Sequence, residues 1–159
     1  MAKTSYAIAL GSNRPSRHGS PTETLRAALA MLKPVTTSKI HATPALGPAG
    51  RAFANAVAIV ESKLEPDEFL VELKALERAF GRRAGRRWGP RVLDLDIILW
   101  SDGPWDGPGP LVPHPEYRNR AFVLKPLAEL APDWRDPVSG LTVRQLLARL
   151  LRPRACRDP

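Results

Sequence analysis

The chain has 159 residues and a single cysteine, Cys156, which excludes an internal disulfide and a cysteine-based zinc site. Its hydrophobic content of 43% and charged content of 25% are ordinary for a globular protein, and its length predicts one domain over residues 1–159. With 24 basic and 16 acidic side chains the net charge is +8, which favours anionic partners such as nucleic acid or phosphorylated metabolites.

The first half of the chain predicts a strand, a helix and two further strands. Residues 5–13 are rich in β-formers and end in a Gly-Ser-Asn turn signal. A capping box at residues 20–23, with proline at the first helical position, begins a helix over 21–33. β-Branched residues then predict strands over 35–43 and 52–62, separated by a loop rich in proline and glycine.

The second half predicts one long helix, one strand and shorter elements. Pro66 begins a helix that stops at Gly81, and a strand follows over 92–100. Residues 101–118 are irregular, 121–130 predict a short strand or a helical turn, and a capping box at Thr142 begins a last helix. We expect the tail, residues 152–159, to be frayed.

This order, β-α-β-β-α-β with extra C-terminal strand or helix elements, predicts an α+β fold. It is the ferredoxin-like arrangement, in which an antiparallel sheet carries both helices on one face. The extra elements would cover the other face and give three layers, α/β/α. RNA binders, metal carriers and enzymes share this fold, so the fold does not select a function.

Two aspartates in the strand 92–100 are the strongest sign of a site. Its two-residue period places Asp94 and Asp96 on one face, roughly 7 Å apart, where their charges repel. Salt bridges to nearby arginines would satisfy them. A site for one or two magnesium ions would also do so, because Mg²⁺ prefers carboxylate oxygens and keeps positions open for phosphate.

The preceding segment, GRRAGRRWGPR (residues 81–91), supports the second interpretation. Its glycines and Gly-Pro pair are incompatible with a regular helix or strand, yet it carries five arginines, which can bind triphosphate oxygens in a bidentate manner. Trp88 could stack on a heterocycle or anchor the loop in the core. The chain has no Walker-type or Rossmann glycine motif, so side chains and metal would have to hold any nucleotide.

The stretch RWGPRVLDLDIILW strongly resembles the signature of the 6-hydroxymethyl-7,8-dihydropterin pyrophosphokinase family. Four further blocks resemble the family in the same order, namely ALGSN, ATPALGP with FANAV, VPHPEYRNRAFVLKPLAELAP and GLTVRQLL. The resemblance covers nearly the whole chain. It implies a folate-pathway enzyme that moves a pyrophosphoryl group from ATP to a pterin alcohol.

The resemblance also implies site residues. Those matching the two magnesium ligands and the arginines of the catalytic loop that closes over ATP are Asp94, Asp96, Arg82 and Arg91. Further nucleotide contacts would be Arg87, Trp88, His114 and Arg120, with weaker ones at Glu77, Ile97 and Arg118. The pterin would meet a loop with Thr43, Pro44 and Leu46, a stacking pair of Phe53 and Phe122, and the amide of Asn55.

The expected mechanism uses two magnesium ions that bridge the α- and β-phosphates of ATP, the co-substrate. The expected protein is a cytoplasmic monomer without nucleic-acid or membrane partners. His41 stands where members of the family usually carry tyrosine, and neither it nor His18 has a predicted function. From the residues alone, Phe53 is more often a core residue than a stacking platform.

Two other functions stay open on the residues alone. A ferredoxin-like RNA-binding module would explain the fold and the charge, but it would carry exposed aromatics where LDLDI has carboxylates. A metal-dependent nuclease or nucleotidyltransferase would also use paired aspartates and arginines. It usually needs a third acidic ligand, for which Glu77 is the candidate.

Overall fold

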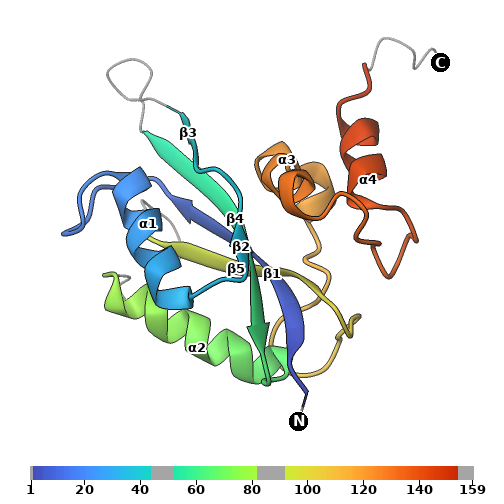
Figure 1. Cartoon of the computed structure of the whole chain (residues 1–159), viewed down its shortest axis with the longest axis horizontal. Coiled ribbons are helices and arrows are strands. Elements are labelled where there is room, and N and C mark those ends of the chain that lie inside the picture. The colour runs from blue at the N-terminus through green and yellow to red at the C-terminus, as the bar shows by residue number, and fades with distance from the viewer. Residues whose placement is uncertain (1, 44–51, 82–91, 154–159) are drawn as a thin grey trace.

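The computed structural model describes residues 2–43, 52–81 and 92–153. An antiparallel sheet lies at the centre, with strand order β2-β4-β1-β5 and with β3 also paired to β4 (Figure 1). Its long strands are β1 (Thr4–Ser12), β4 (Phe53–Ser62) and β5 (Asp94–Trp100). The short ones are β2 (Thr36–Thr37) and β3 (His41–Thr43).

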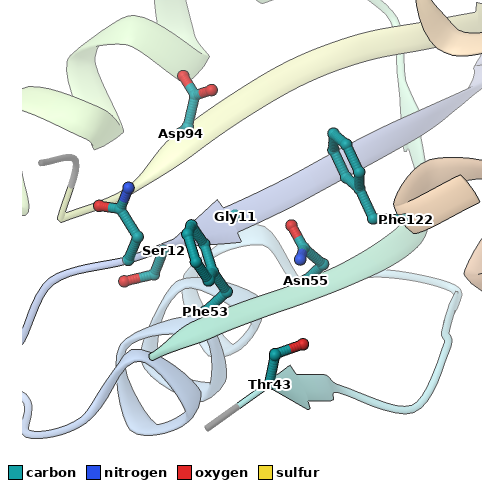
Figure 2. Close-up of a pocket in the computed structure, with 8 residues that line it drawn as sticks. Gly11, Ser12, Thr43, Phe53, Asn55, Asp94 and Phe122 are labelled. Carbon is teal, nitrogen blue, oxygen red and sulfur yellow. The ribbon is translucent and has the colours of Figure 1, made fainter. Parts of the chain in front are cut away.

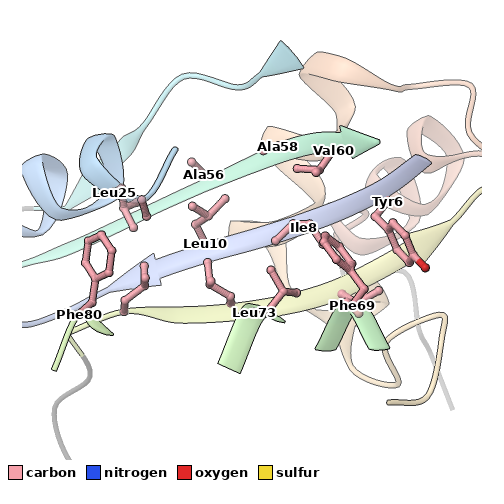
Figure 3. Close-up of a cluster of buried hydrophobic side chains, with 14 of the residues drawn as sticks. Tyr6, Ile8, Leu10, Leu25, Ala56, Ala58, Val60, Phe69, Leu73 and Phe80 are labelled. Atoms are coloured by element: carbon pink, nitrogen blue, oxygen red, sulfur yellow. The ribbon is translucent and has the colours of Figure 1, made fainter. Parts of the chain in front are cut away.

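Helices α1 (Pro21–Leu32) and α2 (Pro66–Ala79) cover one face of the sheet (Figure 1). Figure 3 shows the core between them, where alternate strand residues such as Ile8 and Leu10 meet Leu25 of α1 and Leu73 of α2. Helix α1 begins at a capping box, because Ser20 accepts from the backbone N–H of Glu23 and Glu23 accepts from that of Ser20. These two helices and their apolar stripes follow the sequence pattern.

The opposite face carries α3 (Ala121–Leu130) and α4 (Val143–Leu150), with a short 3₁₀ turn, η1 (Tyr117–Asn119), before them. A second core joins strand residues Ala7 and Val57 to apolar side chains of α3 and α4. A register shift in the β1–β5 pairing turns both Ile98 and Leu99 toward this core. In the described ranges, no helix is long and apolar enough to cross a membrane.

The predicted fold class is confirmed: an α+β protein with an antiparallel sheet between helical layers. Two elements differ from the prediction. The expected strand 35–43 is divided into β2 and β3 because the hydroxyl of Ser38 accepts the N–H of Val57 and so replaces a backbone acceptor. Residues 121–130 form a full helix, α3, although Pro126 lies within it.

The buried carboxylate of Asp136 links the turn before α4 to η1. Asp136 is fully buried, and its oxygens accept from the Nε and Nη2 of Arg118 and from the backbone N–H of Val138. Burial raises the pKa of Asp136, but the Arg118 and Val138 hydrogen bonds outweigh it and hold that pKa well below its usual range.

Because its folded-state pKa is depressed, the ionised Asp136 stabilises the fold above the unfolded pKa of about 3.9, and this contribution is lost as the pH falls below that value. Between pH 5 and pH 2 the wild type should lose more free energy of unfolding than Asp136→Asn, by on the order of 2 kcal/mol. Urea unfolding across that pH range measures the difference.

Asp133→Asn is the matched control, since Asp133 is exposed and pairs with the exposed Arg144 at 3.4 Å. That variant should keep the wild-type pH slope. Equal slopes for the wild type and Asp136→Asn would contradict the assignment.

Candidate functional site

The site lies on the face of the sheet that α3 and α4 cover only in part. At this end β1 finishes, while β4 and β5 begin. The register places Gly11 of β1 opposite Asn55 of β4 on one side and opposite Asp94 of β5 on the other. An amide, a position without a side chain and a carboxylate therefore form one row across three strands.

A pocket of about 410 Å³ opens over this row (Figure 2). It is lined by Gly11, Ser12, Asn13, Thr43, Phe53, Asn55, Asp94 and Phe122. In Figure 2 the ring of Phe53 rises from β4 and that of Phe122 from α3, with the Asn55 amide between them. Phe53 and Phe122 are 45% and 52% exposed, so neither is a core residue and both could contact a ligand in the pocket.

Gly11 lines the pocket, although the sequence pattern assigned it no role in a site. A Cβ built on it would lie 3.3 Å from Oδ1 of Asn55, so a larger residue would press on the amide and fill the pocket floor. Its signal in the sequence was the small side chain among β-formers at the end of β1, which predicted only a turn. The neighbouring Ser12 and Asn13 were missed for the same reason.

A second pocket of about 370 Å³ adjoins the first and contains the acidic pair. Asp94 and Asp96 line it together with Arg120, and Asn55 and Phe122 line both pockets. Burial raises the pKa of Asp96, and the nearby Asp94 carboxylate raises it further. A cation between the two carboxylates would offset that repulsion.

His114 lies beside the acidic pair. Its backbone N–H donates to the carbonyl of Ile98 in β5, at 3.0 Å. Its Nδ1 accepts from the N–H of Glu116, so the neutral ring carries its proton on Nε2. Burial lowers the pKa of His114 while Asp96 opposes that change, and Arg120 lowers it further. His114 is therefore favoured as a neutral hydrogen-bond donor.

Arg120 connects the two pockets. It is the residue before α3, and its Cζ lies 5.7 Å from the ring centroid of Phe122, within the range of a cation–π contact. The guanidinium is thus next to the apolar pocket and the acidic one, where it could bind an anionic group between them.

Three predicted weaker contacts have partners within the protein. Glu77 is fully buried, and its Oε2 accepts from the N–H of Leu95 at 2.7 Å while Lys74 lies 3.3 Å from Oε1. Ile97 is 3% exposed and packs in the core under α1 and α2. Arg118 is paired with Asp136. Their assignment as nucleotide contacts stays a prediction.

The remaining predicted residues lie outside the described ranges. They are Pro44, Leu46, Arg82, Arg87, Trp88 and Arg91. In the part of the chain that is described, no group of three histidine, cysteine or acidic side chains could hold a metal. Among the described residues the acidic pair could therefore supply two ligands at most, and a bound ion would need further oxygens from substrate or water.

Comparison with known proteins gives one consistent result. A family model described as 7,8-dihydro-6-hydroxymethylpterin-pyrophosphokinase matches residues 7–132. A Pseudomonas aeruginosa protein named 2-amino-4-hydroxy-6-hydroxymethyldihydropteridine pyrophosphokinase is 42% identical over 148 residues, which are 89% of this chain and 88% of that relative. A Haemophilus influenzae protein of the same name is 41% identical over 87% of this chain and 88% of its own length.

A Synechocystis protein that also carries this name is 42% identical over 113 residues, or 71% of this chain. The match spans 58% of that relative's length.

The electrostatics of the acidic pair give a testable prediction. Asp94→Asn should bring the pKa of Asp96 down toward its usual value, because the substitution removes the neighbouring negative charge. A ¹³C NMR titration of the carboxyl carbons measures this. Asp102→Asn, at an exposed position after β5, should leave the Asp96 titration unchanged. An unaltered Asp96 pKa in Asp94→Asn would mean that the two carboxylates do not interact electrostatically.

Proposed function

Because this chain belongs to the 7,8-dihydro-6-hydroxymethylpterin-pyrophosphokinase family, we propose that it transfers pyrophosphate from ATP to the hydroxymethyl group of 6-hydroxymethyl-7,8-dihydropterin. Family membership makes it an ATP-dependent pyrophosphokinase of folate biosynthesis. Two adjoining pockets support this proposal. One lies between exposed aromatic side chains, and the other lies beside the paired carboxylates.

The pterin would occupy the pocket between Phe53 and Phe122. A pterin is flat and carries hydrogen-bond donors and acceptors on its edge. Two exposed ring faces suit its plane, and the Asn55 amide supplies both a donor and an acceptor. Gly11 leaves the pocket floor open below that amide. With the ring held there, its hydroxymethyl arm could extend toward Asp94, which lines both pockets.

The triphosphate of ATP would lie in the pocket of the acidic pair. Asp94 and Asp96 fit magnesium through their carboxylate oxygens, and we propose that they hold two ions together with phosphate oxygens. When bound, these ions would neutralise phosphate charge and polarise the attacking and leaving oxygens. Arg120 and the Nε2–H of His114 would bind phosphate oxygens at the same pocket.

In the proposed reaction the pterin hydroxymethyl oxygen attacks the β-phosphorus of ATP. A new oxygen–phosphorus bond forms, the bond from that phosphorus to the bridging oxygen of the α-phosphate breaks, and AMP leaves. The hydroxyl proton passes to water or to a carboxylate oxygen of the acidic pair. Arg82 and Arg91, which match the family's catalytic arginines, would stabilise the charge that develops on the transferred group.

Asp96→Ala should reduce kcat by on the order of 10³-fold, the loss expected when a group that stabilises transition-state charge is removed. Since the fold raises the pKa of Asp96, its charge is unfavourable there, and the melting temperature should stay the same or rise. AMP formation that depends on added pterin alcohol measures turnover. Asp106→Ala, at an exposed carboxylate after β5, should keep full activity. Undiminished turnover in Asp96→Ala would discard the metal-ligand proposal.

Asn55→Ala should raise the KM for the pterin alcohol about 10-fold or more, because the ring would lose hydrogen bonds on its edge. The KM for ATP should change by less than about twofold. Steady-state kinetics with each substrate varied separates these effects. Thr37→Ala, on an exposed strand paired to the same β4, should alter neither value. A rise in the ATP KM alone would place the pterin elsewhere.

A further inference from the structure

One carboxylate holds β3 against α3. Oε2 of Glu129 accepts from the backbone N–H of Lys39 at 3.0 Å, and Oε1 pairs with Nε2 of His41. Burial raises the pKa of Glu129, but these hydrogen bonds lower it below its usual value, so the carboxylate is ionised at neutral pH. We call this arrangement of Glu129, Lys39 and His41 the β3 clamp.

The clamp joins the two walls of the aromatic pocket. On β3, His41 lies opposite Asn55 and Thr43 lies opposite Phe53 in the antiparallel register. On α3, Phe122 and Glu129 are seven positions apart, so they lie on the same helix face with about 10 Å of rise between them. Thr43 and Phe122 both line the pocket, and the clamp binds the elements that carry them.

The strand β3 needs such a restraint. It consists of three exposed residues, and in the part of the chain that the structure describes its ladder pairs with β4 alone. A pairing that short is marginal in water. Within the described ranges, Glu129 provides the polar contacts that tie this segment to α3.

We propose that Glu129 is a positioning residue for the pterin pocket. By holding β3 against α3 it fixes the separation of the walls formed by Thr43 and Phe122, and thereby the affinity for the pterin ring. The inference rests on the proposed function, because it assumes that the ring binds in this pocket. It also assigns a role to His41, for which the sequence predicted no function.

The test compares pterin and ATP kinetics in Glu129→Ala and Glu129→Gln. The alanine variant should raise the KM for the pterin alcohol about 5-fold, while kcat at saturating pterin and the KM for ATP stay within about twofold. The glutamine variant keeps an oxygen that can accept from Lys39, so its pterin KM should rise by less. Unchanged pterin KM in Glu129→Ala overturns the proposal.

His41→Ala removes the contact between His41 and Glu129 while keeping the hydrogen bond from the Lys39 N–H to Glu129. Alone it should raise the pterin KM about 2- to 3-fold, and in the Glu129→Ala background it should add almost nothing, because both substitutions remove the same interaction. Full additivity of the two effects would overturn the clamp. Calorimetric titration of pterin in the presence of a non-hydrolysable ATP analogue should reproduce the same order of affinities.

Asp133→Ala is the matched control. It removes an exposed, ion-paired carboxylate just after α3 that lines neither pocket, so it should leave all three kinetic parameters unchanged. Equal losses in pterin and ATP parameters for Glu129→Ala would indicate general damage and overturn the positioning role.

Failure of the proposed function would look different. The wild type would then form no AMP in response to pterin alcohol, or Asn55→Ala would bind pterin as tightly as the wild type. If the wild type is active and Asn55→Ala is impaired, a normal Glu129→Ala overturns the positioning role alone.

Discussion

The antiparallel pairing of β1 with both of its neighbours is the constraint on which the site depends. This register brings Asn55, Gly11 and Asp94, which are far apart in the sequence, into one row at the end of the sheet. A one-residue slip on either side would turn the amide or the carboxylate into the core under α1 and α2. The two apolar cores oppose such a slip, because alternate residues of the same three strands are buried in one core or the other.

The two faces of the sheet differ in how completely helices cover them, and this difference explains where a polar site can exist. Under α1 and α2, the sheet face is covered by aliphatic and aromatic side chains. On the other face, α3 and α4 pack over Ala7, Val57 and Ile98, and the remaining end carries Asp94 and Asp96. Both carboxylates are partly accessible there, and partial burial raises the pKa of Asp96.

Much of the fold could be predicted from local patterns. Helix α1 follows from its capping box, and the shared face of Asp94 and Asp96 follows from strand periodicity. The sequence could not show that Ser38 would divide a strand by using its hydroxyl as an acceptor, or that Pro126 would lie inside a helix. Both outcomes depend on partners that are distant in the chain.

The same limit applies to the site. The aromatic rings and the amide could be proposed from a family resemblance, but the roles of Gly11 and Glu129 depend on which strand or helix lies beside them. From the family resemblance, Arg118 and Glu77 are expected to be weaker nucleotide contacts. In the fold they meet Asp136 and the backbone of Leu95, contacts that no short pattern encodes.

The hydrogen bond that the Leu95 N–H donates to Glu77 has a consequence for the outer edge of the sheet. Among the described strands β5 is the last in the order, and the outward amide groups of an edge strand can recruit a strand from another molecule. The Leu95 N–H already donates to the Glu77 carboxylate, whose negative charge would repel an incoming carbonyl oxygen. The Leu95 amide is therefore not available to pair with a strand from another molecule.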